Sequence, residues 1–391
     1  MEMTQPGITI TEHLISQWSN NAFIGTPIFI GYTQSPTDEN THNNTVIKLT
    51  SLTDFPLSFS KTVLMYYSVC HFFENGGQQA YMLSLGQEPK KGKGRSLIAE
   101  LQQDWLKHAI TAESEITLII VPDIARFNQL GNVDSWLQFW QSVLNLCKSR
   151  RGIMALLDAP DQPKLAAQCL MEFSSKDRPW GAVYWPRVNS SYQEHNRPVV
   201  LSPTAAVAAI IQRYDNEQGV WTAPANVSLA KAISPLCSHI KADGLFNQDG
   251  TSLNLVRSFP GKGIRIWGCR TLENIPDSPW RYIQTRRLVS YIEAHLTQLG
   301  RAFVFEPNNA ITWMKLKGQS HNWLRQLWLK GGLRGIQEEH AFEVLLGVHE
   351  SMNEDELREG KMIMKIRLAL LIPAEFIELS LVFDTRTGML D

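Results

Sequence analysis

The sequence of 391 residues lacks an apolar run long enough to span a bilayer, and it does not open with a basic segment followed by an apolar one. We therefore expect no membrane insertion and no signal peptide, with synthesis in the cytoplasm. Charge of one sign is also missing, because 37 Lys plus Arg face 38 Asp plus Glu. This balance does not favour nucleic acid or an anionic membrane as a partner.

Motifs that carry common chemistry are missing as well. The five cysteines are odd in number and form no CxxC pair, which argues against a disulfide framework and a zinc site. The loop GQEPKKGKGRS is no P-loop, because Gly94 precedes Arg95 rather than Lys, and Gly261-Lys262 precedes Gly263. HExxH, HxxxH and GxSxG are absent too. We expect no metal and no cofactor, and we expect the cysteines to be buried: Cys70, Cys147, Cys169, Cys237 and Cys269.

Compact apolar runs alternate with stretches of helical period from Pro27 to about Tyr214. The runs read PIFIGYT, QAYMLSLG, ITLIIVPD, GIMALLDAP and WGAVYWP. Runs that are apolar on both faces are typical of parallel strands covered by helices. The pattern therefore predicts a doubly wound α/β domain.

The rhythm breaks after Trp221. Ser278-Pro279 then begins a helix that ends near Gly300, RAFVFEP has the pattern of a strand, and a second helix ends before Gly331-Gly332. Two further strand-like runs, AFEVLLGV and KMIMKIRLALLIP, make the last third α+β. We predict the α/β domain at 23–220 and a second, α+β domain at 221–372.

Two acidic residues are candidates for catalysis. Asp123 and Asp158 each follow an apolar run, and ligands bind at the carboxyl ends of parallel strands. Paired carboxylates there can hold Mg²⁺ or act as nucleophile and base, as in a soluble phosphatase or hydrolase. Each aspartate also lies beside a proline, where an acceptor side chain is ordinary turn chemistry. The sequence leaves both interpretations open.

The chain ends in a strand pattern. Ile377, Leu379, Leu381 and Phe383 alternate with polar neighbours, which predicts a strand with one buried face. Such a strand needs backbone partners, and only a short polar tail follows it. It therefore folds back or pairs elsewhere.

An ordered series of segments resembles one known family. The series runs PGITITEH, FIGTPIFIGYT, HFFENGGQQAYMLSLG, GVWTAPAN, GIRIWGCRTL, SPWRYIQTRRLVSYIEAHL, FVFEPNNAITW, LWLKGGLRG and IPAEFIELSL. In this order and spacing it resembles the sheath proteins of contractile phage tails, R-type pyocins and extracellular contractile injection systems, nearly from end to end.

The resemblance implies a structural subunit without enzymatic activity. Such subunits form a helical sheath of stacked rings around an inner tube and contract to drive the tube through a target envelope. The particle is a virion or a released phage-tail-like particle. Its other components are the baseplate, the tail cap and, in some particles, sheath paralogues, and its assembly needs no nucleic acid. The alternative is the hydrolase that uses Asp123 and Asp158.

The resemblance also implies which residues contact neighbouring proteins. In the family the terminal arms, which would be residues 1–22 and 373–391 here, add strands to a sheet of neighbouring subunits, and residues 221–372 would form the core domain. This would place the following residues at subunit contacts: Ile8, Ile10, Ile377, Leu379, Leu381 and Phe383. The C-terminal domain faces the tube in the family. On that domain we expect Arg325, Lys330 and Arg334 to meet acidic groups of the tube.

Overall fold

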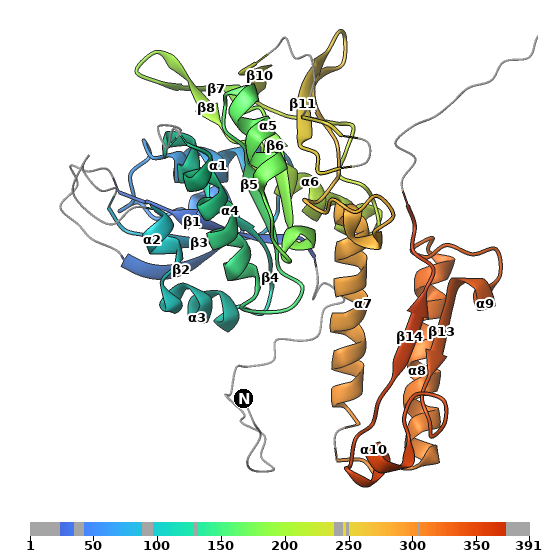
Figure 1. Ribbon diagram of the computed structural model, residues 1–391. Coiled ribbons are helices and arrows are strands. Elements are labelled where there is room, and N and C mark those ends of the chain that lie inside the picture. The colour runs from blue at the N-terminus through green and yellow to red at the C-terminus, as the bar shows by residue number, and fades with distance from the viewer. Residues whose placement is uncertain are drawn as a thin grey trace, which may run out of the picture.

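The computed structural model describes residues 24–34, 43–87, 97–127, 132–237, 245–247, 250–303 and 305–372. Within them, nine strands form one mixed sheet in the order β2-β3-β1-β4-β5-β6-β11-β12-β9 (Figure 1). The stretch from β3 to β6 is parallel, and its strands coincide with the apolar runs of the sequence. These strands are β1 (Thr26–Gly31), β3 (Ala80–Leu85), β4 (Ile116–Ile120), β5 (Met154–Asp158) and β6 (Gly181–Trp185). The predicted α/β fold is confirmed.

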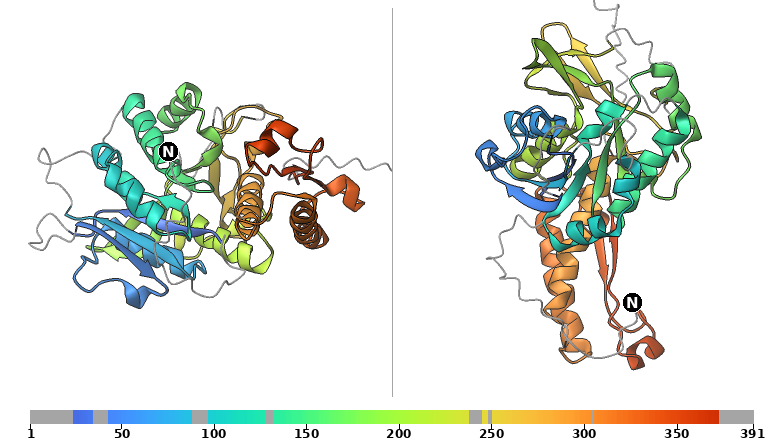
Figure 2. Two further views of the ribbon diagram at one scale, coloured as in Figure 1. Left: turned by 90° about the horizontal axis from the view of Figure 1, so that it is seen from below. Right: turned by 90° about the vertical axis from the view of Figure 1, so that its left-hand side faces the viewer.

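Both faces of the parallel strands are buried under helices (Figure 2). Ile28 and Ile30 of β1 point to one face and Phe29 to the other, and all three are fully buried. Helices α2 to α5 cover the first face, and α1 and α6 cover the second. Their bounds are α1 (Leu64–Glu74), α2 (Leu97–Leu101), α3 (Asp104–Ala112), α4 (Val133–Cys147), α5 (Pro163–Glu172) and α6 (Thr204–Glu217).

Glycine and proline mark one boundary each of α1 and α6. Gly76 follows α1 with φ +93°, and the N–H of Gly77 donates to the carbonyl of Phe72 over 3.1 Å. A side chain at Gly77 would come within 2.3 Å of the Phe72 ring, so only glycine allows this ending. Pro203 directly precedes α6. Local sequence therefore determines where both covering helices of the second face begin or end.

The sheet continues past the predicted domain boundary. β11 (Asn254–Phe259) runs parallel to β6, and β12 (Gly263–Trp267) and β9 (Val227–Ser228) follow antiparallel. At the opposite edge β2 (Asn43–Leu49) is antiparallel to β3. The prediction that the α/β part ends at residue 220 was therefore wrong for the sheet. β9 and β12 are an edge pair with alternating exposure, which lacks the all-apolar signature of the central strands.

A small second sheet lies beside the large one at the top of Figure 1. It consists of the antiparallel strands β7 (Val188–Glu194), β8 (Arg197–Leu201) and β10 (Ala232–Pro235). His195 and Asn196 form the β7–β8 turn with φ values of 49° and 60°, a conformation that favours Asn. The α/β part also contains three short 3₁₀ helices, which are η1 (Leu52–Asp54), η2 (Pro122–Phe127) and η3 (Arg178–Trp180).

The C-terminal part is a helical hairpin with a two-stranded ribbon packed on it (Figure 1). Leu288 and Ile292 pack against Leu324 and Leu327 of the second helix and against Phe342 of the ribbon. The elements are η4 (Pro279–Arg281), α7 (Ile283–Arg301), α8 (Ala310–Leu329), α9 (Glu338–Ala341), β13 (Phe342–Leu345), α10 (Glu354–Arg358) and β14 (Lys365–Leu368). The predicted α+β character of the last third is confirmed.

The strand predicted from RAFVFEP is not formed. The described residues of this segment are the end of α7 and turns, and Phe305 has φ +80° with 75% of its surface exposed. Leu299 and Phe303 pack against a small apolar cluster around Leu316 instead of pairing with a strand. Among the described residues, no helix has both the length and the apolar character that crossing a bilayer requires.

Candidate functional site

Asp123 lies just after β4, at the carboxyl edge of the parallel strands, as predicted. Its side chain is buried, and Oδ2 accepts a hydrogen bond of 2.6 Å from the backbone N–H of Tyr32. A side chain at Gly31 would come within 2.2 Å of this oxygen. The carboxylate thus ties the end of β1 to η2 and requires glycine at position 31.

Asp158 is the last residue of β5 and is also buried. The hydroxyl of Ser202 donates to Oδ1 over 2.6 Å, and the same hydroxyl accepts from the N–H of Thr204 over 3.1 Å. Burial raises the pKa of Asp158 to about 7, although the Ser202 hydrogen bond and Arg187 act to lower it. The aspartate therefore joins the end of β5 to the start of α6.

These contacts agree with the structural interpretation of both aspartates. Each carboxylate is enclosed and accepts a hydrogen bond from its own chain. Among the described residues, no group of three or more His, Cys, Asp or Glu side chains is arranged to hold a metal ion. The described cysteines are free thiols, and Cys237 is the one that is only partly buried.

A buried ion pair joins the α/β part to the C-terminal hairpin. Asp215 of α6 and Arg287 of α7 form a two-pronged contact, with 2.8 Å between Nη1 and Oδ1, and both side chains are at most 5% exposed. Asp215 Oδ2 also accepts a 2.7 Å hydrogen bond from the N–H of Gly25, which directly precedes β1. We call these three residues the clasp. It connects the start of β1, the end of α6 and the first turns of α7.

Sequence reasoning missed the clasp. Its members are separated by 190 and 72 positions along the chain, and an Asp near a helix end or an Arg in a helix has no special signature alone. The sequence did contain one signal of a buried ion pair. Arg287 falls on the apolar side of α7 beside Leu288, where a charged side chain needs a partner.

The ribbon of β13 and β14 has two unlike faces. Phe342 and Val344 face the hairpin, opposite Leu368 and Ile366, whereas Glu343 pairs with Arg367 on the outer face at 2.8 Å. In the described chain this sheet has two strands, so the outer edge of each strand meets no further strand. Open edges of this kind accept additional strands.

The residues expected to contact an inner tube do not form one patch. Arg325 is exposed on α8, and its Nε lies 3.1 Å from Glu338 Oε2 of α9. Lys330 is the C-cap residue of α8. It points away from the side of Arg325, because two residues that are five positions apart lie about 140° apart around a helix axis. Arg334 is exposed beyond the glycines, and its N–H donates to the carbonyl of Ala369. Lys330 therefore lies on a different side of α8 from Arg325.

The predicted arm residues lie outside the described residues. They are Ile8 and Ile10 near the start, and Ile377, Leu379, Leu381 and Phe383 near the end. The described chain begins at Ile24 and ends at Ile372, directly after the ribbon. Arm contacts at these positions remain predictions.

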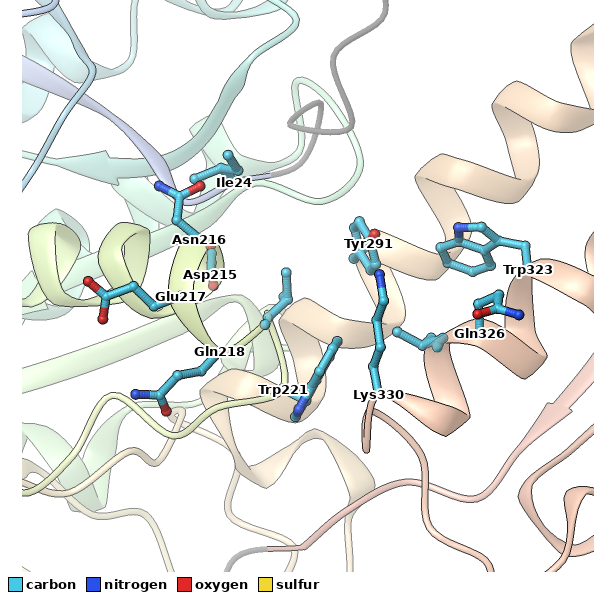
Figure 3. A pocket seen from close by; sticks show the side chains of 13 residues that line it. Ile24, Asp215, Asn216, Glu217, Gln218, Trp221, Tyr291, Trp323, Gln326 and Lys330 are labelled. Carbon is cyan, nitrogen blue, oxygen red and sulfur yellow. The ribbon is translucent and has the colours of Figure 1, made fainter.

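A groove of about 600 Å³ lies between the α/β part and the hairpin (Figure 3). The end of α6 and the following turn form one wall, and Tyr291, Trp323 and Lys330 form the other. The Trp323 ring stacks on His295 at 4.0 Å and lies 5.5 Å from Tyr291. Burial lowers the pKa of His295, which favours the neutral ring in this stack.

Comparison with solved structures gives matches over nearly the whole chain. A chain of the anti-feeding prophage (AFP) baseplate in the contracted state is 44% identical, with TM-score 0.86, over 98% of this chain and all of the other. A chain of the contracted AFP helical sheath is 26% identical, with TM-score 0.72 over the same shares. A chain of the PVC sheath complex of an extracellular contractile injection system has the same fold, with 24% identity and TM-score 0.74 over 99% of each chain.

Comparison with known sequences points to the same proteins. The family model described as the phage tail sheath C-terminal domain matches residues 276–384. The tail sheath protein of Enterobacteria phage T4 is 26% identical over 147 residues, which are 36% of this chain and 21% of the phage protein. The family-model match covers the hairpin, the ribbon and the segment after it, and the AFP match covers the remainder. The chain therefore belongs to the family of contractile tail sheath proteins.

Proposed function

We propose that the chain is a sheath subunit that polymerises in stacked rings around an inner tube and contracts to drive the tube through a target envelope. The observation that carries this proposal is the match to the AFP chain, which is 44% identical over its full length. The comparisons support a sheath and not the hydrolase that the sequence left as the alternative. A structural role without catalysis fits the buried positions of Asp123 and Asp158, whose carboxylates hold loops in place.

We place the chain at the baseplate end of the sheath. Two chains of AFP baseplate structures match this chain, at 44% and 26% identity, and a chain of the contracted AFP helical sheath matches at 26%, so the highest identity of these three belongs to a baseplate chain. A subunit of this type contacts baseplate proteins on one side and sheath paralogues on the other. The tail cap lies at the far end of the sheath, so this chain would be linked to it through the sheath paralogues and would not contact it directly. The particle assembles in the bacterial cytoplasm.

Labelling within assembled particles tests the role and the position. An epitope tag inserted in the exposed β7–β8 turn, between His195 and Asn196, leaves the core and both arms unchanged. Antibody-bound gold in electron micrographs is expected on the sheath and concentrated next to the baseplate. Gold along the whole sheath would contradict the position but not the role, and particles without any gold would contradict both.

We further propose that the β13–β14 ribbon receives the arms of neighbouring subunits. The part of the N-terminal arm around Ile8 and Ile10 of one neighbour, and residues 373–391 of another, would add strands at the two outer edges of the ribbon. The open edges support this, since a two-stranded ribbon gains stability from every strand that pairs with it. The apolar face of each added strand would continue the row formed by Phe342 and Val344.

Contact with the tube is proposed for Arg325 and Arg334, with Lys330 acting from the groove side. Replacing both arginines by Glu should raise the proportion of empty or already contracted sheaths, because acidic groups of the tube would be repelled. Each exposed contact contributes only about 0–1 kcal/mol, so the effect depends on repetition over many subunits and weakens in salt. Electron micrographs of particles at low and high salt provide the counts.

Lys164→Glu with Arg197→Glu is the matched control for this charge reversal. Both residues are exposed on the α/β part, and the pair changes the net charge equally. Lys330→Glu forms a separate arm of the experiment, because Lys330 lines the groove. Wild-type counts for the two-arginine variant would show that the tube is held by another surface.

A further inference from the structure

The groove between the two parts of the subunit combines an aromatic wall with neutral amides. Trp221, Tyr291 and Trp323 are only half buried there, although they belong to the edge of the hairpin core. Asn216, Gln218 and Gln326 lie at its rim (Figure 3). Glu217 and Lys330 contribute opposite charges, and the Asp215 carboxylate in the lining is paired with Arg287, so these charges cancel. Such a surface fits apolar and uncharged polar side chains.

The chain enters the structure at this groove. Ile24 is the first described residue and lines the groove, and the clasp holds the next residue through the 2.7 Å bond from Gly25 to Asp215. The chain is therefore fixed in place directly beside the groove. The 23 residues before Ile24 all extend from this point.

The segment that immediately precedes Ile24 has the composition that the groove requires. Residues 14–23 read LISQWSNNAF, which contains two aromatic rings, aliphatic side chains, amides and hydroxyls, and no charge. Leu14, Trp18 and Ala22 recur every fourth position, with Ile15 beside them, as on one side of a helix. Phe23 adjoins Ile24, and Trp18 lies within about 20 Å of it even in a fully extended chain.

We propose that residues 14–23 fold back into the groove of their own subunit, with Trp18 and Phe23 against the rings of Trp221, Tyr291 and Trp323. The attachment at Ile24 favours this occupant, because a short tether supplies an effective concentration of about 1 mM. The docked segment fills the space between the α/β part and the hairpin and fixes the angle between them. Residues 1–13, with Ile8 and Ile10, continue beyond the groove as the arm.

Photochemical cross-linking of the full-length chain tests the proposal without requiring a sheath. With p-benzoylphenylalanine in place of Trp18, irradiation should link residue 18 to the peptides that contain Trp221 or Trp323, as identified by mass spectrometry. Irradiation of mixed ¹⁵N-labelled and unlabelled chains should give links within one isotope only. Links between isotopes would identify a neighbouring copy as the occupant, and links confined to other surfaces would place the segment elsewhere. Either result overturns the proposal.

A groove-filling variant separates docking from chance proximity. Gln326→Trp is expected to lower the cross-link yield about tenfold, the change that about 1.4 kcal/mol produces in an equilibrium. Met314→Trp adds the same ring near the other end of α8, where residue 314 is 67% exposed, and should leave the yield unchanged. Circular dichroism confirms that both variants are folded. Equal yields in the two variants would contradict docking in the groove.

Discussion

Removal of residues 374–391 is expected to prevent this chain from entering particles while leaving the monomer folded. The described members of the hairpin cluster end at Leu370, so the truncated chain keeps all of them. A donated strand with about four backbone hydrogen bonds, at about 1 kcal/mol each, would lower subunit affinity about a thousandfold when lost. Circular dichroism of the monomer, and immunoblots of purified particles, measure the two effects.

Paired substitutions in the full-length chain control for the deletion. Leu379→Asp with Leu381→Asp places charge on the apolar side of the predicted strand and should reproduce the loss from particles. Ser380→Asp places charge on the opposite side and should be incorporated as the wild type is. Normal incorporation of the truncated chain would show that the C-terminal arm is dispensable.

Asp215→Ala is expected to lower the free energy of unfolding by about 3–5 kcal/mol, because it leaves Arg287 charged, buried and unpaired. The substitution also deprives the Gly25 N–H of its acceptor at the start of β1. Urea denaturation, followed by circular dichroism, measures the shift in midpoint. Asp215→Leu combined with Arg287→Met should be less destabilising than Asp215→Ala, since no buried charge remains.

An exposed ion pair on the ribbon provides the comparison. Arg367 and Glu343 are 2.8 Å apart, but their side chains are 75% and 47% exposed. Arg367→Ala should therefore change stability by about 0–1 kcal/mol. If Asp215→Ala were no more destabilising than Arg367→Ala, the clasp would not hold the two parts together.

The sequence predicted the parallel strands because they are apolar on both faces, a pattern that few other elements share. It also predicted α7, α8 and the ribbon strands, whose apolar positions follow a regular period. It failed for the edge strands β9 and β12, because one side of them faces solvent and their short runs resemble loops. The strand prediction for RAFVFEP failed for a related reason. A short run of apolar residues at the end of a helical hairpin has the same sequence pattern as a strand.

The candidate site was harder to predict than the fold. The sequence placed Asp123 and Asp158 correctly at the strand ends, but it did not show that their oxygens are used within the chain. It grouped Arg325, Lys330 and Arg334 as exposed basic residues of one domain, but it did not show that Lys330 points toward the groove. Contacts across the subunit, such as that of Asp215 with Arg287, depend on the tertiary arrangement and leave no local pattern.

The position of the clasp makes α7 a lever. Arg287 lies near the start of this helix, and about 21 Å of helix separates it from Arg301 at the far end. If the hairpin pivots by about 10° around the clasp, the distal end moves by about 4 Å while the sheet stays still. The ribbon packs along the same hairpin and moves with it. Small rotations at one buried ion pair are thereby amplified into displacements comparable with the spacing between neighbouring strands.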